Sequence, residues 1–166
     1  TMRQIGERIG LRDEAEAAAR GVEQQLPQIK SKVSGQTRPR SLLVFGREAG
    51  TLRHIEASGG YGFLHDLLEL AGGDDVLGDI HQAKVDMSTE MVLARQPEVL
   101  IELHYGNDVH LERLDQERAV WNGLPSLPAV KNHRVHLLVG NEFVVPGPRV
   151  VHAAEQLART LHPGAW

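Results

Sequence analysis

The stretch that decides the fold is a short apolar run that ends at a glycine, Ser41-Leu42-Leu43-Val44-Phe45-Gly46. An apolar run of this length is typical of a strand that is buried on both faces of a parallel sheet. Residues 98–103 and 134–139 repeat the pattern. Helices are expected between and after these runs, at residues 63–71, 88–95, 111–120 and 148–161. This alternation predicts an α/β domain, a Rossmann-like parallel sheet sandwiched by helices.

The residues before the first strand are expected to be helical. A short helix should stop at Gly10, and apolar residues then recur at helical spacing as far as Val33. Asp13 and Glu16 have the spacing of a capping box, and Pro27 should kink the helix or remove one hydrogen bond. Such a helix would be roughly 30 Å long. It is either an ordinary packed N-terminal helix or a strut that joins two bodies, and residues 34–40 follow it as a linker.

Composition excludes several classes of protein. The 166 residues are 41% hydrophobic and 24% charged with a net charge of -4, which is ordinary for a globular domain and gives no basic footprint for nucleic acid. The absence of cysteine excludes disulfides and thiolate metal sites. No apolar run approaches the ~20 residues of a membrane span. No secretory signal is visible, although the chain opens inside an expected helix.

Three loops follow the predicted strands, at residues 46–51, 104–108 and 140–149. Ligands of parallel α/β sheets lie beyond the carboxyl ends of the strands. The loops mix glycine with polar and aromatic groups, which suits ligand contact as well as ordinary turns. The candidate ligand-binding residues in them are Arg47, His104, Tyr105, Glu142, Phe143 and Arg149.

The chain contains many histidines but no recognisable metal or catalytic motif. Nine histidines are present, but no HExxH motif exists, and His133 and His136 would point to opposite faces of a strand. His104 with Tyr105 is the best local candidate, because imidazole or phenolate can ligate heme iron. No GxSxG elbow and no complete P-loop occurs. The chain is therefore expected to have no dedicated metal site, no cofactor of its own and no enzymatic activity.

Four segments together resemble the Fe³⁺-siderophore, heme and cobalamin binding-protein family of ABC importers. They are YGFLHDLLELAGGDDV (residues 61–76), STEMVLARQPEVLI (88–101), LPAVKNHRV (127–135) and VPGPR (145–149) with the helix that follows it. The second is similar to the family's Ser-x-Glu…Pro-Asp-x-Ile-Ile segment, and the third to its Leu-Pro-Ala-Val-x-x-Gly-x-Val segment. Residues 5–10 (IGERIG) also resemble the start of the family's interdomain helix, so the matches run in family order from Ile5 to Pro163, nearly the whole chain.

The resemblance implies a substrate-binding protein with two α/β lobes joined by one long helix. Residues 1–36 would be that interdomain helix and residues 37–166 the C-terminal lobe, with the N-terminal lobe outside this chain. The transported ligand would be an iron chelate, heme or cobalamin, and the partners would be the importer's membrane subunits and the other lobe. The protein would be periplasmic or lipid-anchored.

The resemblance also gives Glu90 a role. A glutamate in the Ser-x-Glu context docks to arginines of the importer, so Glu90 is the expected docking residue. The cobalamin-binding member has a tryptophan before this segment, whereas residues 79–86 contain no aromatic residue here. Lys84 or Arg47 facing the cleft would instead suit an anionic ligand such as heme propionates.

Two rival functions remain at this point. A stand-alone α/β enzyme, such as a metal-assisted hydrolase, would need a complete catalytic set within 166 residues. An adaptor domain would keep the fold without transport. An isolated lobe is also expected to self-associate through its bared apolar surface.

Overall fold

The computed structural model describes residues 1–106 and 111–166. The chain begins with a helical hairpin, α1 (Met2–Ile9) and α2 (Arg12–Val33). Gly10 ends α1 in the left-handed conformation, with φ 78°. Gly6 lets the two helices touch, because a Cβ atom at that position would lie 2.2 Å from the Cβ atom of Ala15.

The predicted capping box of α2 is wrong. Leu11 is the N-cap residue and its side chain makes no capping hydrogen bond. The carboxylate of Glu16 instead accepts a hydrogen bond of 2.6 Å from Arg3 of α1. A capping box forms at α1, where the hydroxyl of Thr1 accepts a hydrogen bond from the backbone N–H of Gln4. Glu16 therefore forms an ion pair with Arg3 of α1, and it does not take part in the capping box that the local spacing predicted.

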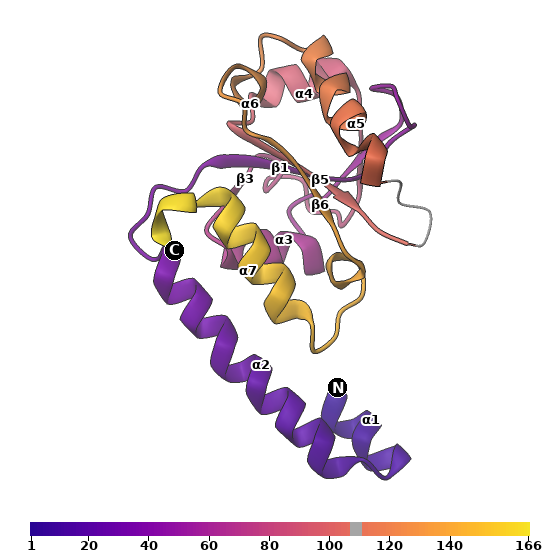
Figure 1. Ribbon diagram of the computed structural model, residues 1–166, viewed down its shortest axis with the longest axis vertical. Helices are drawn as coiled ribbons and strands as arrows, with labels where there is room; N and C mark the ends of the chain where they lie inside the picture. Colours follow the sequence, from indigo (N-terminus) through magenta and orange to yellow (C-terminus); the bar gives the residue numbers. More distant parts are fainter. Residues whose placement is uncertain (107–110) are drawn as a thin grey trace.

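One mixed sheet forms the centre of the lobe (Figure 1). Its strands are β1 (Arg40–Gly46), β2 (Ile55–Ala57), β3 (Asp74–Asp75), β4 (Val85–Met87), β5 (Val99–His104) and β6 (Val135–Val139). The order is β4-β2-β1-β5-β6, with β3 also paired to β1. The three predicted strands β1, β5 and β6 are parallel neighbours, which confirms the predicted fold class. The antiparallel extension through β2 and β4 was not predicted.

Helices cover both faces of the sheet (Figure 1). On one side lie α4 (Thr89–Arg95), α5 (Leu114–Val120) and α6 (Pro128–Lys131), and on the other α3 (Phe63–Leu70) and α7 (Val150–Leu161). Single 3₁₀ turns are η1 (Leu111–Arg113), η2 (Trp121–Gly123), η3 (Asn141–Phe143) and η4 (Pro163–Ala165).

Strand β1 divides the core between these two layers. Leu42 and Val44 pack with the cluster around Trp121, whereas Leu43 packs with the cluster of α3 and α7. Alternate residues of a strand point to opposite faces, so burial on both faces explains why the run is apolar throughout.

Helix α2 is a strut that is anchored at its end. Its 22 residues give a length of about 33 Å, and Ile29 and Val33 are buried against α7 and α3 near the C-terminal end of the helix. Figure 1 shows the rest of α2 running away from the sheet, with α1 folded back beside its far end. The sequence left a packed helix and a strut between two bodies as alternatives; in this chain α2 packs on the lobe through its C-terminal turns and projects from it at its other end. Among the described residues, no helix is both long and apolar enough to cross a membrane.

Candidate ligand-binding edge of the sheet

The carboxyl ends of β1, β5 and β6 lie at one edge of the sheet. The parallel register pairs Val44 with Glu102 and His104 with Val139, so the loops that follow these strands emerge side by side. The backbone N–H of Gly106 donates a hydrogen bond of 2.8 Å to the side-chain oxygen of Asn141, which joins the β5 and β6 loops. Asn107 and Asp108 of the second predicted loop lie outside the described residues. We call this region the carboxyl edge.

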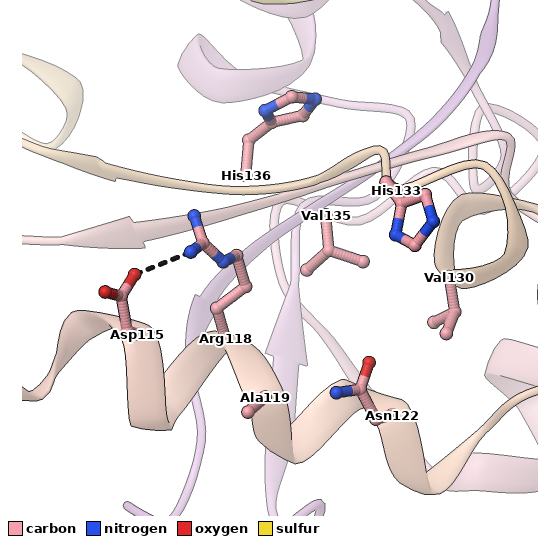
Figure 2. A pocket seen from close by; sticks show the side chains of 8 residues that line it. All are labelled: Asp115, Arg118, Ala119, Asn122, Val130, His133, Val135 and His136. Atoms are coloured by element: carbon pink, nitrogen blue, oxygen red, sulfur yellow. Dashed lines mark hydrogen bonds and ion pairs between the residues drawn. The ribbon is translucent and has the colours of Figure 1, made fainter.

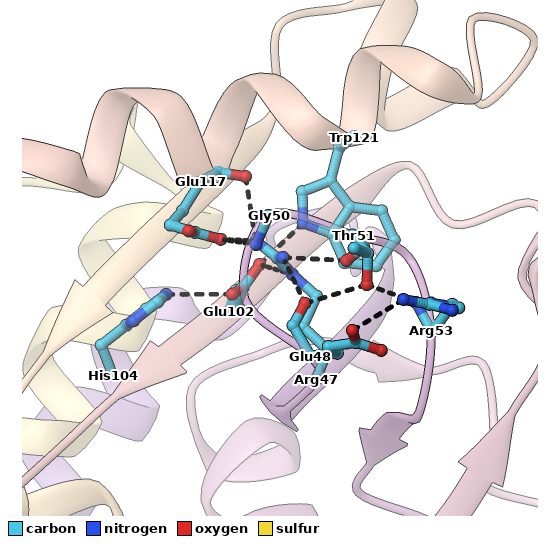
Figure 3. A network of polar contacts seen from close by, with 9 residues as sticks. All are labelled: Arg47, Glu48, Gly50, Thr51, Arg53, Glu102, His104, Glu117 and Trp121. Carbon is cyan, nitrogen blue, oxygen red and sulfur yellow. Dashed lines mark hydrogen bonds and ion pairs between the residues drawn. The ribbon is translucent and has the colours of Figure 1, made fainter.

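A buried polar network lies under the carboxyl edge (Figure 3). The guanidinium of Arg47 bonds to Glu102 Oε2 at 3.0 Å, to the backbone oxygen of Thr51 at 3.0 Å and to the backbone oxygen of Glu117 at 2.9 Å. The indole N–H of Trp121 donates to Glu102 Oε2 at 2.7 Å. The network therefore ties the β1 loop and α5 to the interior of β5.

Burial and hydrogen bonding act in opposite directions on Glu102. Burial by itself raises the pKa of this carboxyl. The neighbouring imidazole of His104, then the hydrogen bonds from Trp121 and Arg47 together with the charge of Arg47, outweigh burial and lower the pKa of Glu102 below its usual value. Glu102 is thus a buried carboxylate, paired as such groups must be.

Arg47 lies inside the lobe, which corrects its predicted place in the cleft. Its side chain is only 2% exposed, and every bond described above points inward. A direct contact with an anionic ligand is therefore not available to this guanidinium. The position in the β1 loop was right, but the side chain turns back into the protein because two carboxylates, Glu102 and Glu117, receive it there.

His104 and Tyr105 end strand β5 at the carboxyl edge. The Nε2 atom of His104 lies 3.0 Å from Glu102 Oε1, at ion-pairing distance, and it is buried without a hydrogen-bond partner among the described residues. The imidazole is 22% exposed and Tyr105 is 44% exposed. These two predicted residues are therefore adjacent at the carboxyl edge, where Tyr105 is the more exposed of the two.

The β6 loop divides its predicted residues between surface and core. Phe143 is completely buried in the cluster of α3 and α7, so it supports the loop from within and does not face a ligand. Glu142 is also buried, and its Oε1 lies 2.8 Å from Nδ1 of His152. Burial raises the pKa of Glu142, but its own backbone N–H and then His152 outweigh burial, and the pKa falls below the usual value.

Arg149 is exposed beside a cavity of about 390 Å³ between α2 and α7.

Lys84 lies apart from this group. It precedes β4, the outer strand, which is three strand spacings or about 14 Å from β5. Its ammonium pairs with Glu56 and lies 3.5 Å from Asp86. The structure therefore does not bring Lys84 together with His104 and Tyr105.

Glu90 is exposed in the first turn of α4, as predicted. Strand β4 runs in the same direction as β1, since both are antiparallel to β2, so the start of α4 lies at the carboxyl edge. The hydroxyl of Ser88 caps the helix by accepting from the backbone N–H of Met91 at 3.3 Å. Hydrogen bonds from the backbone N–H of Glu90 and from Ser88 hold the pKa of Glu90 below its usual value.

Sequence reasoning missed several residues that build this edge. Glu102 was read only as part of a buried strand, although an acidic residue inside an apolar run is itself a signal of a paired buried charge. Nothing in local spacing indicates Glu117, Trp121 or His152. Among the described residues, no three histidine or acidic side chains are placed to hold a metal ion.

The fold is an α/β lobe that is attached to a long helix, with the loops after its parallel strands grouped at one end of the sheet. The sequence model of the family described as periplasmic binding protein matches residues 1–140, so the chain belongs to that family. The family consists of extracytoplasmic substrate-binding proteins of ABC transporters.

Individual relatives agree with this assignment. The vitamin B12-binding protein of Salmonella typhimurium is 26% identical over 161 residues, which are 97% of this chain and 54% of the relative. The structure of an ABC-type Fe³⁺-hydroxamate transport system from Saccharomonospora viridis has a TM-score of 0.80 at 23% identity and covers 96% of this chain and 53% of that one. The periplasmic heme-binding protein RhuT from Roseiflexus sp. RS-1 has a TM-score of 0.77 at 21% identity, with 99% and 62% covered. The chain spans about half the length of the curated relatives it matches.

Proposed function

We propose that this chain is the C-terminal lobe, with its connecting helix, of the substrate-binding component of an ABC importer. The ligand would be an iron chelate, either heme or a ferric siderophore, or cobalamin. The observation that carries the proposal is the meeting of the β5 and β6 loops at the carboxyl edge, with His104 and Tyr105 beside them. Membership of the periplasmic binding protein family supports it. The component would act outside the cytoplasm, free or lipid-anchored.

Binding would be reversible enclosure of the ligand between this edge and a second lobe. Tyr105 offers a phenolate and His104 an imidazole, both of which can ligate ferric iron. Arg149 carries a guanidinium suited to carboxylate groups of a ligand. No bond of the ligand would be broken or formed by the protein, so the role is binding and not catalysis.

The ligand is tested on the longer protein that contains this chain. Purified apoprotein is titrated with heme, with a ferric hydroxamate and with cobalamin, following visible absorption and intrinsic fluorescence. We expect saturable binding of one of the three, and for an iron ligand Tyr105→Phe should change the charge-transfer absorption. Tyr61→Phe is the control for a second exposed tyrosine, because the Tyr61 ring contacts His81 with their centroids 4.8 Å apart. Saturation by none of the three ligands would count against the proposal.

Docking to the importer would use Glu90. Exposed charges of this kind set the orientation and rate of docking more than the affinity. We expect Glu90→Lys to reduce uptake in cells while ligand affinity of the purified protein is unchanged. Asp74→Lys is the control, since Asp74 is exposed at the opposite, amino end of the sheet. Uptake that is equal in the two variants would rule out the docking role.

Nothing among the described residues favours the rival metal-assisted hydrolase or the adaptor domain. Ligand binding for an ABC importer is therefore the one function proposed.

A further inference from the structure

The buried network under the carboxyl edge carries more negative than positive charge (Figure 3). The guanidinium of Arg47 lies between two carboxylates, at 3.0 Å from Glu102 and 2.9 Å from Glu117. All three side chains are largely buried, and solvent and salt screen buried charges less than exposed ones. One guanidinium facing two carboxylates leaves one net negative charge beneath the loops at which a ligand would bind.

Lys84 shows the same imbalance on the outer strands of the sheet. Glu56 of β2 lies beside the carboxyl end of β1, since a Cβ atom at Gly46 would lie 2.9 Å from Glu56 Oε2. The ammonium of Lys84 pairs with Glu56 and lies 3.5 Å from Asp86. The sequence suggested Lys84 as a partner for an anionic ligand, but the structure gives it two carboxylates of the protein instead.

The other arginines of the edge loops and of the η1–α5 segment each have an acidic neighbour. They are Arg53 beside Glu48, Arg149 beside Glu142, Arg113 directly after Glu112 and Arg118 beside Asp115. Figure 2 shows the last of these pairs, in which Nη2 of Arg118 donates to Oδ1 of Asp115 at 2.6 Å. Glu90 pairs with no lysine or arginine in the described part of the chain and adds a further negative charge. The described charges of the edge are therefore negative in sum.

This charge balance decides which ligands the edge can accept. A charged group that is enclosed between two lobes loses its water and needs a partner of opposite charge in the protein. The described cations of the edge already have carboxylate neighbours, so an anionic group of a ligand would compete with the protein's own carboxylates. The excess negative charge repels such a group in addition and attracts a cationic one.

Resting on the function proposed above, we propose that this lobe selects a chelate that is neutral or positively charged and disfavours an anionic one. Glu117 is the specificity-determining residue, because it is the second carboxylate on a guanidinium that Glu102 already neutralises. A ferric trihydroxamate, in which three hydroxamates balance the charge of the iron, belongs to the favoured class. Heme, with two propionates, belongs to the disfavoured class.

The test uses the longer protein that contains this chain and ligands that differ in one group. Ferrioxamine B has a terminal ammonium, its N-succinyl derivative has a carboxylate, and the primary amide of that derivative is the uncharged isostere. We expect the amide to bind roughly threefold to tenfold more tightly than the carboxylate, as Coulomb's law gives for unit charges about 10 Å apart at an intermediate dielectric constant. Ferrioxamine B itself should bind at least as tightly as the amide. High salt should reduce these differences.

Cobalamin offers a second pair, for the case in which it and not the hydroxamate saturates the protein. Cyanocobalamin carries propionamide side chains, and hydrolysis of one of them gives a monocarboxylic acid of nearly the same shape. The same order is expected, with the amide form binding more tightly than the acid.

Three variants locate the origin of the selection. Glu117→Gln keeps the shape of the side chain and should bring the ratio of amide to carboxylate affinity toward one. Glu48→Gln should act in the same direction but more weakly, because its carboxylate is exposed, and it keeps the test valid if Glu117→Gln unfolds. Glu98→Gln is the matched control, since it removes the same charge at the opposite end of β5 and should leave the ratio unchanged.

The outcomes separate this inference from the function on which it rests. Equal or tighter binding of the carboxylate forms, or saturation by heme, would overturn the charge selection and leave the proposed function intact. A ratio that stays at the wild-type value in both Glu117→Gln and Glu48→Gln would also overturn it. Saturation by no hydroxamate, no cobalamin and no heme would contradict the proposed function itself, and the charge selection with it.

Discussion

At the scale of single residues, the candidate site depends on the buried carboxylate of Glu102. Glu102 accepts from Arg47 and Trp121, and it lies beside His104 at the carboxyl edge. Loss of one partner of a buried pair is expensive because it leaves the other charge without compensation. The packing of the edge and the stability of the lobe are therefore coupled through this residue.

Replacing Glu102 with glutamine should lower the free energy of unfolding by about 3 kcal/mol, because Arg47 then keeps one carboxylate partner among the described residues, Glu117. Urea denaturation at pH 7 measures the loss. Glu48→Gln is the control, since its carboxylate pairs with Arg53 in solvent and should cost less than about 1 kcal/mol. Equal losses in the two variants would contradict the role of the network.

The same network predicts a pH dependence. The pKa of Glu102 is lowered in the folded protein from its ordinary value of 4.5. Its contribution is therefore complete above about pH 4.5 and is lost as the pH falls through the folded pKa. The difference in stability between wild type and Glu102→Gln should shrink over that range.

His162 should give a pH dependence in the range nearer neutrality. Its side chain is buried with Nε2 3.1 Å from the backbone oxygen of Gly72, and burial lowers its pKa from the ordinary 6.5. The unfolded chain takes up this proton at a higher pH than the folded chain, so stability falls as the pH drops below about 6.5. We expect the loss of unfolding free energy between pH 7.5 and 5.5 to be smaller in His162→Gln than in wild type.

The control for that measurement is His81→Gln, because His81 is an exposed histidine. This variant should keep the wild-type pH dependence. A wild-type slope in His162→Gln as well would show that the buried imidazole does not cause the effect.

Residue positions at the edge were more predictable than side-chain directions. Tyr105 lies exposed beyond a strand end, where strand counting put it. Arg47 was placed in the correct loop, but its two carboxylate partners are 55 and 70 positions away in sequence, so no local pattern indicates that it turns inward. Phe143 is buried because α7 and α3 close over it, which is likewise a long-range outcome.

At the scale of elements, long periodic segments were predicted well and short ones were not. The 22-residue α2 carries enough helical repeats for its period to decide the structure, and β1, β5 and β6 are recognised by their short apolar runs. Strands β2 and β4 have three residues each, too few to establish alternation, and their pairing comes only from contact with β1 and with each other.

The junction between α2 and the lobe is held by the C-terminal residue. The ring of Trp166 has Lys32 Nζ 4.0 Å from its centroid and the guanidinium carbon of Arg159 4.3 Å from it. Trp166 also packs against the cluster that contains Ile29 and Val33. The Trp166 ring therefore links the C-terminal end of α2, through Lys32, to α7, through Arg159.

Trp166→Ala should destabilise this junction by about 1–2 kcal/mol through lost cation–π and packing contacts. Hydrogen exchange of residues 26–33 should accelerate more than that of β5, because the clamp acts on the end of α2. Lys30→Ala is the control, since Lys30 is exposed on the same helix. Uniform acceleration over the whole chain would indicate general unfolding and not a loosened strut.

At the scale of the whole molecule, the far end of the strut carries apolar surface that the described residues leave uncovered. Ile5 is 60% exposed, Ile9 62% and Leu11 46%, around an apolar cavity of about 260 Å³. The chain spans about half of its curated relatives, so in a longer protein this face is expected to pack against the other lobe. In the isolated chain the same face is free to meet a second copy.

We therefore expect the isolated chain to self-associate, with a sedimentation coefficient that rises with concentration. The double variant Ile5→Glu, Ile9→Lys should stay monomeric, because charged side chains in the contact resist desolvation. Both positions are exposed, so the fold should be preserved, with a circular dichroism spectrum like that of wild type. Tyr61→Ser removes an equally exposed aromatic residue on the lobe and should leave association unchanged.

A wild-type chain that sediments as a monomer at every concentration would refute the expectation. Association that persists in the double variant would instead place the contact elsewhere, with the open edge of β6 the next surface to test by substitution.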